Sequence, residues 1–201
     1  PPSFFFHAYA GIRHCLLSRG LGDVYKRQLL KDVLPVENGF VKGDLDKDIC
    51  QVALVERHRG TGQITNGFVS GFGYKEKCAV ASTVAHDSHH MIIVGTDQEN
   101  MALAGNHLAS IGGGVTVFKD GVELATVSLN IAGLMSDAPA QNVAKAADNM
   151  VEAMQICGCK INNGYMQHSL LALVVIPELR ISDLGLIDVK KFEITKLLDK
   201  A

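Results

Sequence analysis

Short apolar runs separated by turn-forming residues recur along this chain from residue 29 onward and limit it to a sheet-containing fold. Residues 79–85 and 91–94 are two such runs, rich in alanine and β-branched side chains. Runs of this length and composition are typical of buried β-strands. Between them lies the sequence HDSHH at residues 86–90. We therefore expect the chemically densest part of the chain at a strand-to-strand junction, where a rigid sheet presents polar groups to solvent or to another domain.

The histidine-rich junction allows three interpretations. His86 and His89 are three residues apart beside Asp87, and imidazoles with a carboxylate are ligands that a divalent transition metal accepts. A metal site also needs three or four convergent ligands. Asp87 and Ser88 are common turn formers that bond to the backbone, and histidines often serve as hydrogen-bonded structural groups. Metal binding, ligand contact and a structural role all remain open at this point.

Length, charge and cysteine content exclude several protein classes. The 201 residues are 47% hydrophobic, which is enough to bury a core in one domain or one and a half. The net charge of −2, without long runs of Lys and Arg, argues against a nucleic-acid partner. The five cysteines are odd in number and scattered, which suits a reducing cytoplasm. No apolar stretch is long enough to span a bilayer, so we expect no membrane partner and a cytoplasmic location.

The first 28 residues differ from the remainder. They begin PPSFFF without an initiator Met, and GLGDVYKRQ at residues 20–28 looks like translated adaptor sequence. A signal peptide is the alternative, but His7, Arg13 and His14 interrupt the apolar stretches. We therefore expect residues 1–28 to be a non-native, disordered tail and residues 29–201 to form one domain.

Two main helices are expected to cover the sheet. Thr96 followed by Glu99 is a capping box, and apolar residues then recur at helical spacing until the glycines at 112–114. The segment SDAP at residues 136–139 opens the second helix, with an oxygen cap and a proline near the first position.

The remaining segments complete the expected fold. Asp120-Gly121 between two apolar runs predicts a β-hairpin. The apolar loop at residues 131–136 packs either on its own core or against another domain or subunit. Periodicity does not distinguish helix from strand at residues 166–176. We expect an α/β (α+β) fold, with a mixed, partly antiparallel sheet and two main covering helices.

Several motifs, in order along the chain, resemble the C-terminal domain of bacterial adenine deaminases. The similarity extends over about residues 35–195 and is carried by ENGF (37–40), VER (55–57), TVAHDSHHMIIVG (83–95), MALA (101–104), GGG (112–114), IAGLMS (131–136), VIPEL (175–179) and GL (185–186). His90 departs from the family pattern, in which asparagine is usual. This departure weakens the case for His90 as a required ligand.

The resemblance implies a hydrolase of the amidohydrolase superfamily, acting in purine salvage or catabolism. In this family a metal-bound hydroxide attacks the purine carbon that bears the amino group, so that adenine and water give hypoxanthine and ammonia. The ligands of the manganese or iron, including a His-x-His pair, lie in a TIM-like barrel that precedes this domain. No His-x-His occurs in this chain. We therefore expect the chain alone to lack the catalytic metal and to be inactive.

The resemblance also suggests partners and site residues. The expected partners are the protein's own N-terminal barrel, adenine and further copies in a homo-oligomer. His86, Asp87, Ser88 and His89 are the candidates for substrate-site or interdomain contact, facing the barrel mouth. Two alternatives remain: a free-standing ligand-binding or oligomerisation module, and a small metal hydrolase built on His86, His89 and His90.

Overall fold

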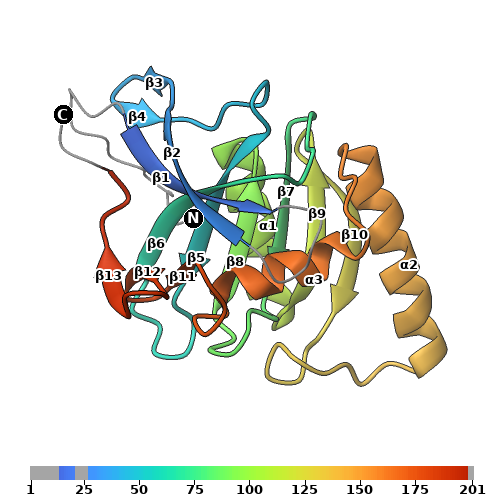
Figure 1. Cartoon of the computed structure of the whole chain (residues 1–201). Coiled ribbons are helices and arrows are strands. Elements are labelled where there is room, and N and C mark those ends of the chain that lie inside the picture. Colours follow the sequence, from blue (N-terminus) through green and yellow to red (C-terminus); the bar gives the residue numbers. More distant parts are fainter. Residues whose placement is uncertain (1–13, 21–26, 199–201) are drawn as a thin grey trace.

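An eight-stranded sheet forms the centre of the computed structural model, which describes residues 14–20 and 27–198 (Figure 1). The strand order is β10-β9-β7-β8-β5-β6-β1-β2, and neighbouring strands are antiparallel except for β1 and β6, which are parallel. The strands of this sheet are β1 (His14–Gly20), β2 (Arg27–Val33), β5 (Ile49–Val55), β6 (Ile64–Ser70), β7 (Cys78–Ser82), β8 (Met91–Gly95), β9 (Gly114–Lys119) and β10 (Val122–Ser128).

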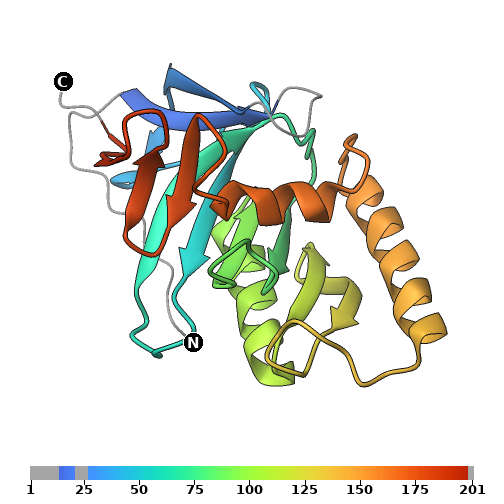
Figure 2. The ribbon, with the colours of Figure 1, turned by 60° about the horizontal axis from the view of Figure 1, so that its bottom comes forward.

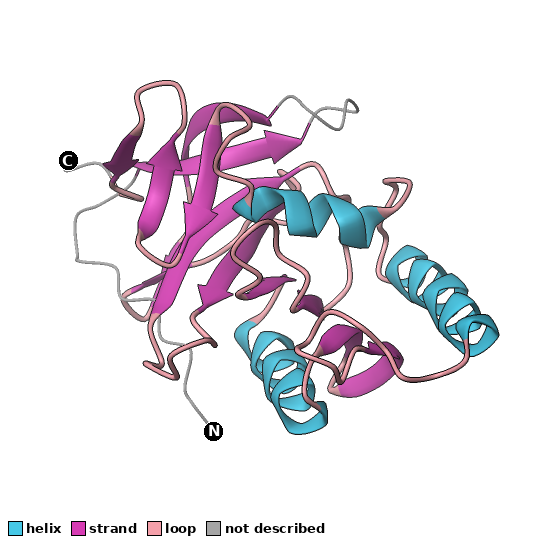
Figure 3. Cartoon of the chain, turned by 90° about the horizontal axis from the view of Figure 1, so that it is seen from below, coloured by secondary structure: helices cyan, strands magenta, loops and turns pink. Residues whose placement is uncertain are grey.

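The middle strands are apolar on both faces because both faces are covered. Along β7, Val80 belongs to the core on one face, whereas Ala79 and Ala81 belong to the core on the other. Helix α1 packs on the alanine face, and the other helices cover the opposite face (Figure 3). The helices are α1 (Gln98–Ile111), α2 (Ala140–Ile156), α3 (Gly164–Ser169) and the 3-10 helix η1 (Leu170–Ala172). The small alanine side chains let α1 approach the sheet closely.

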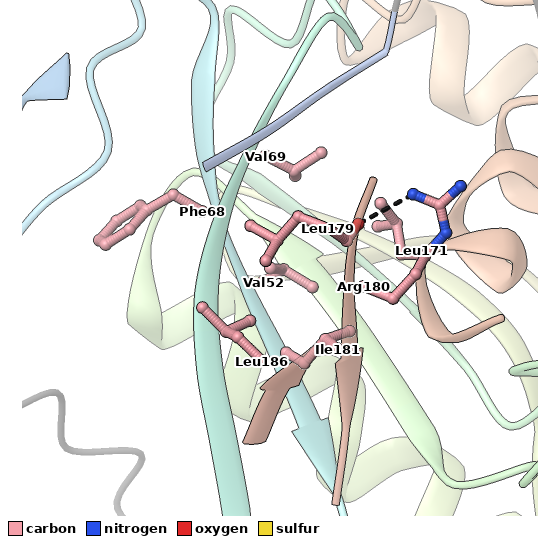
Figure 4. Close-up of a pocket in the computed structure, with 8 residues that line it drawn as sticks. All are labelled: Val52, Phe68, Val69, Leu171, Leu179, Arg180, Ile181 and Leu186. Atoms are coloured by element: carbon pink, nitrogen blue, oxygen red, sulfur yellow. Dashed lines mark hydrogen bonds between the residues drawn. The ribbon is translucent and has the colours of Figure 1, made fainter. Parts of the chain in front are cut away.

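A second, three-stranded sheet packs beside α3 on the same face as α2. It consists of β11 (Leu179–Ser182), β12 (Gly185–Asp188) and β13 (Glu193–Thr195), and a two-stranded ribbon is made of β3 (Val36–Glu37) and β4 (Phe40–Val41). Figure 4 shows side chains of β11 and β12 facing those of β5 and β6 around a small cavity. The volume of this cavity is about 10 Å³. Such a volume holds one water molecule at most, so the two sheets are closely packed.

The fold expected from the sequence is confirmed. The sheet is mixed and mainly antiparallel, and the residues that the structure describes form no closed barrel. Asp120 and Gly121 form the turn between β9 and β10, both with positive φ, as the hairpin prediction requires. The undecided run at residues 166–176 begins as helix, in α3 and η1. Within that run His168 is a buried core residue, bonded to the Tyr74 hydroxyl at 3.1 Å.

Both predicted helix caps are wrong in detail. Asp97, not Thr96, caps α1, because its carboxylate accepts the Asn100 backbone N–H at 2.9 Å. The Thr96 hydroxyl instead donates to the Glu76 carbonyl and accepts the Cys78 backbone N–H, which connects it to the edge of β7. Helix α2 begins after Pro139 without a side-chain cap. Local sequence spacing could not reveal the partners of Thr96, since Glu76 and Cys78 lie 20 and 18 residues away along the chain.

The replacement Asp97→Ala is expected to lower the free energy of unfolding by about 1 kcal/mol, because the first turn of α1 then loses its capping acceptor. Asp97→Asn keeps an acceptor oxygen at this position and serves as the matched variant, with a much smaller loss expected. Urea-induced unfolding of both proteins measures the difference. Equal losses for the two variants would contradict the capping role.

The expected tail contains a strand that belongs to the large sheet. Strand β1 pairs with β2 and β6, and the last two residues of the expected tail, Arg27 and Gln28, belong to β2. The remaining part of the expected tail, residues 1–13 and 21–26, lies outside the described residues. The proposal that residues 1–28 form a non-native, disordered tail stays a prediction. Among the described helices, none is long and apolar enough to cross a membrane.

Candidate functional site

Loops from distant parts of the chain meet at the lower edge of the large sheet in Figure 1, which Figure 2 turns toward the viewer. The histidine loop, residues 83–90, joins β7 to β8. The arginine loop, residues 56–63, joins β5 to β6. Strands β5 and β7 are both antiparallel to β8, so they run in the same direction. The loops that follow them therefore lie at the same end of the sheet's strands. The site is therefore set by sheet topology.

A buried carboxylate gives the arginine loop its shape. Glu56 is only 3% exposed, and its two oxygens accept four hydrogen bonds. The donors are the backbone N–H groups of His58, Arg59 and Thr61 and the Thr61 hydroxyl, at 2.7 to 3.0 Å. These bonds favour the ionised form and lower the pKa of Glu56 to about 2. The Glu56 carboxylate therefore stabilises the conformation of the arginine loop by accepting hydrogen bonds from residues of the same loop.

Arg57 connects the arginine loop to two other segments. Its guanidinium donates to the His89 carbonyl at 2.6 Å and to the Ala132 carbonyl at 2.9 Å. The Thr83 hydroxyl donates to the neighbouring Gly133 carbonyl at 2.7 Å. The loop at residues 131–136 is therefore bonded to its own domain, although the side chains of Ile131 and Met135 remain exposed.

His90 lies between the histidine loop, the arginine loop and the turn that carries Asp183. Its Nε2 is 3.7 Å from an Asp183 oxygen, and its Nδ1 is 3.9 Å from a Glu56 oxygen. The His58 ring lies 4.7 Å away between centroids. Burial lowers the pKa of His90 and outweighs the attraction of the two carboxylates. His90 is therefore a neutral, buried connector between loops.

The four predicted site residues lie together but differ in exposure. Asp87 and Ser88 are exposed, whereas His86 and His89 are half-buried with their rings 5.5 Å apart, edge to face. The Ser88 carbonyl accepts a bond from His58 Nε2 at 2.6 Å. Burial, with the nearby His86 and Arg57, lowers the pKa of His89. The histidine loop therefore presents two imidazoles, a carboxylate and a hydroxyl at the edge of the domain.

A buried ring nitrogen and an exposed carboxylate of this loop have no hydrogen-bond partner among the described residues. The Nδ1 atom of His89 is buried without a hydrogen-bond partner. The exposed Asp87 carboxylate forms no hydrogen bond or ion pair with any residue described here. Buried polar groups in folded proteins are nearly always bonded, so an orphaned imidazole nitrogen calls for a partner. Hydrogen bonding to a ligand or a neighbouring domain is the chemistry that this loop offers.

The described side chains do not assemble a metal centre. No group of three or more His, Cys, Asp or Glu residues is arranged to hold an ion anywhere in residues 14–20 and 27–198. His90 faces Glu56 and Asp183, while His86 faces His89. The three histidines on which a metal hydrolase would be built are thus divided between two clusters.

Sequence reasoning missed the partners of the histidine loop. Glu56, Arg57 and His58 come from the arginine loop, and Asp183 comes from the turn between β11 and β12. The signal that could have drawn attention to them is the sequence ERHR at residues 56–59, which directly follows the apolar strand β5. A charged run at the end of a buried strand is positioned like the histidine loop itself.

Comparisons with known proteins agree with the motifs. A family model described as the adenine deaminase C-terminal domain matches residues 25–193. The adenine deaminase of Ruegeria sp. (strain TM1040) is 69% identical over 164 residues, covering 82% of this chain and 27% of the relative. That of Moorella thermoacetica is 48% identical over 165 residues, covering 82% of this chain and 28% of the relative. The chain thus spans little more than a quarter of these relatives, and it belongs to the adenine deaminase C-terminal domain family.

Proposed function

We propose that this chain is the C-terminal part of an adenine deaminase whose reaction takes place mainly in a preceding part of the polypeptide. The observation that carries the proposal is the match to the C-terminal domain family, combined with coverage of only 27% of a relative that is 69% identical. The whole enzyme would convert adenine and water to hypoxanthine and ammonia in a cytoplasmic homo-oligomer. The buried free thiols of Cys50, Cys78, Cys157 and Cys159 suit such a reducing location.

The catalytic metal is proposed to lie outside this chain. Manganese or iron would lower the pKa of a bound water and hold it for attack on the purine. The residues described here do not fit that role, because no group of them has the ligands for an ion. The preceding barrel implied by the family resemblance would supply the ligands, and the chain alone would be inactive.

The histidine loop is proposed to face that barrel and to help to close or shape the purine site. His89 keeps a low pKa and an unbonded Nδ1, so its neutral imidazole can accept or donate one hydrogen bond. The exposed Asp87 and Ser88 add an anionic acceptor and a hydroxyl. Arg57 and His58 hold the backbone of this loop through bonds to the His89 and Ser88 carbonyls. The backbone of the histidine loop is therefore fixed by the arginine loop, while its polar side chains remain available to the proposed barrel.

A chimeric enzyme tests the proposal. The matching segment of the Ruegeria sp. relative is replaced by this chain's residues, and ammonia release from adenine is measured with and without manganese or iron. We expect metal-dependent deamination by the chimera and none by this chain alone. Deamination by the chain alone, or an inactive chimera that is folded and loaded with metal, would refute the proposal.

Within the chimera, His86→Ala is expected to lower turnover or adenine affinity by roughly tenfold, as for residues that support a reacting centre. His107→Ala is the matched control, because His107 lies on α1 and bonds Thr126 away from the histidine loop. Steady-state kinetics measure both variants. If turnover and affinity are unchanged in His86→Ala, the histidine loop does not contribute to the purine site.

A further inference from the structure

A broad groove lies next to the histidine loop. Its volume is about 470 Å³, and it lies between the segment that follows η1, the turn after β11 and strands β12 and β13. Asp87 and Ser88 form part of its wall. The groove and the candidate site are therefore continuous.

The walls of this groove are apolar and exposed. Five of its lining side chains are large hydrophobic residues open to solvent: Val174, Val175, Leu184, Phe192 and Ile194. Such residues are common singly on a surface, but a contiguous cluster marks an interaction site. Phe192 is 86% exposed and Ile194 is 60% exposed, so neither side chain contributes much to the core of this domain.

The backbone at Phe192 strengthens this interpretation. Phe192 has φ of +54°, in the left-handed region that favours glycine and asparagine. A bulky residue there is strained, and an exposed ring gains little burial in return. Strained residues of this kind concentrate at binding and functional sites, where the side chain makes its contacts with another molecule or segment.

The rim of the groove defines the chemistry of its occupant. Asp183 is already paired with Arg59 at 3.5 Å and faces His90. Glu193 has Lys191 at 3.6 Å. Asp87, in contrast, has no hydrogen bond or ion pair with the described residues. An occupant would therefore combine an apolar surface with a basic or N–H-bearing group opposite Asp87.

We propose that the groove is the docking surface for the preceding part of the same polypeptide, which enters it through an apolar ridge flanked by such a donor. The occupant is inferred from length, since nearly three quarters of the 69%-identical relative lies outside the matched region. Docking in the groove would place the histidine loop directly beside the occupant, because Asp87 and Ser88 belong to the histidine loop and also line the groove. The inference rests on the proposed function only in requiring that a preceding part exists.

Hydrogen exchange measured by mass spectrometry tests the docking surface without using activity. Backbone amides in residues 173–176 and 184–195 are expected to exchange roughly tenfold or more slowly in the chimera than in this chain alone. The β9–β10 hairpin, which is far from the groove in sequence and position, serves as the internal control. Equal exchange of the groove segments in both proteins would overturn the proposal.

Matched variants identify the occupied face. Ile194→Asp lies in the groove and Ile156→Asp lies at the end of α2, and both isoleucines are 60% exposed. In the chimera, Ile194→Asp is expected to remove the protection, and Ile156→Asp to keep it. Phe192→Asn supplies a second groove variant that relieves backbone strain instead of threatening the fold. Loss of protection in Ile156→Asp, or retention in both groove variants, contradicts docking at this surface.

Two further outcomes separate this inference from competing ones. Protection of the groove in the isolated chain, appearing together with a dimer in sedimentation, would mean that a second copy occupies it and would overturn the proposal. A protected groove in a folded chimera that does not deaminate adenine would sustain docking and reject the proposed function. A chimera that deaminates adenine while its groove segments exchange as fast as in the isolated chain would sustain the proposed function and reject docking at the groove.

Discussion

Gly113→Ala is expected to lower the free energy of unfolding by about 3 kcal/mol, because it combines backbone strain with overpacking. Gly113 has φ of +119°, a conformation that residues with a Cβ rarely adopt. A Cβ at this position would lie 2.5 Å from the Gly133 Cα and 2.9 Å from the Thr83 hydroxyl. That hydroxyl bonds the Gly133 carbonyl, so the clash falls where the histidine loop meets residues 131–136.

Gly121→Ala is the matched control for this prediction. Gly121 also has positive φ, +82°, but at this hairpin turn no atom lies within 4 Å of the place that an added Cβ would take. The variant is expected to lose only about 1 kcal/mol, from backbone strain alone. Denaturant unfolding compares the two variants. Similar losses for both would mean that the close contact with Gly133 does not contribute.

Glu56→Gln is expected to lower the melting temperature by several degrees at neutral pH and to loosen the arginine loop. The amide nitrogen of glutamine would face N–H and O–H donors of Thr61 or His58 and could not accept their bonds. Exchange of the amides in residues 57–63 should therefore accelerate. Because Arg57 and His58 hold the histidine loop, that loop should loosen as well.

The same substitution should remove a specific part of the acid sensitivity. The pKa of Glu56 is lowered from 4.5 to about 2 in the folded protein, so its ionised form stabilises the fold above pH 4.5. That contribution is lost as the pH falls from 4.5 to about 2, where the folded protein also takes up the proton. The difference in melting temperature between the wild type and Glu56→Gln should therefore shrink over this range.

Glu152→Gln supplies the comparison for acid sensitivity. Glu152 is exposed on α2, so its loss removes a carboxylate without disturbing a buried network. Its melting temperature is expected to follow that of the wild type at every pH. If Glu56→Gln also followed the wild type between pH 4.5 and 2, the bonds to Glu56 would not contribute to stability.

Local pattern was sufficient for the central strands and the two main helices. The apolar runs at β5, β7 and β8 are buried strands, and the stripe of Met101, Ala104 and Leu108 is the buried face of α1. These features are predictable because a strand covered on both faces is a short continuous apolar run, whereas a helix buried on one face repeats its apolar residues every 3.6 positions. The cap of α1 escaped prediction because Thr96 had a second possible partner, on the neighbouring strand.

The site was predictable only in part. Its chemically dense loop was visible as three histidines and an aspartate within five residues. Glu56 and Arg57, however, were recognised only as part of a family motif, and Asp183 was not singled out. Their importance comes from contacts across long sequence separations, such as Arg57 with His89 and with Ala132.

The sequence by itself determined the family, the central strands, the two main helices and the loop that carries the histidines. These follow from ordered motifs and from short-range periodicity, which each segment contains independently of its neighbours. Only the tertiary structure decided that His90 turns inward to Glu56 and Asp183 while Asp87 and Ser88 line an apolar groove. The reason is that the order of strands in the sheet, not distance along the sequence, decides which loops lie side by side at the strand ends. A side chain in one loop meets its partners in another only after these strands have paired.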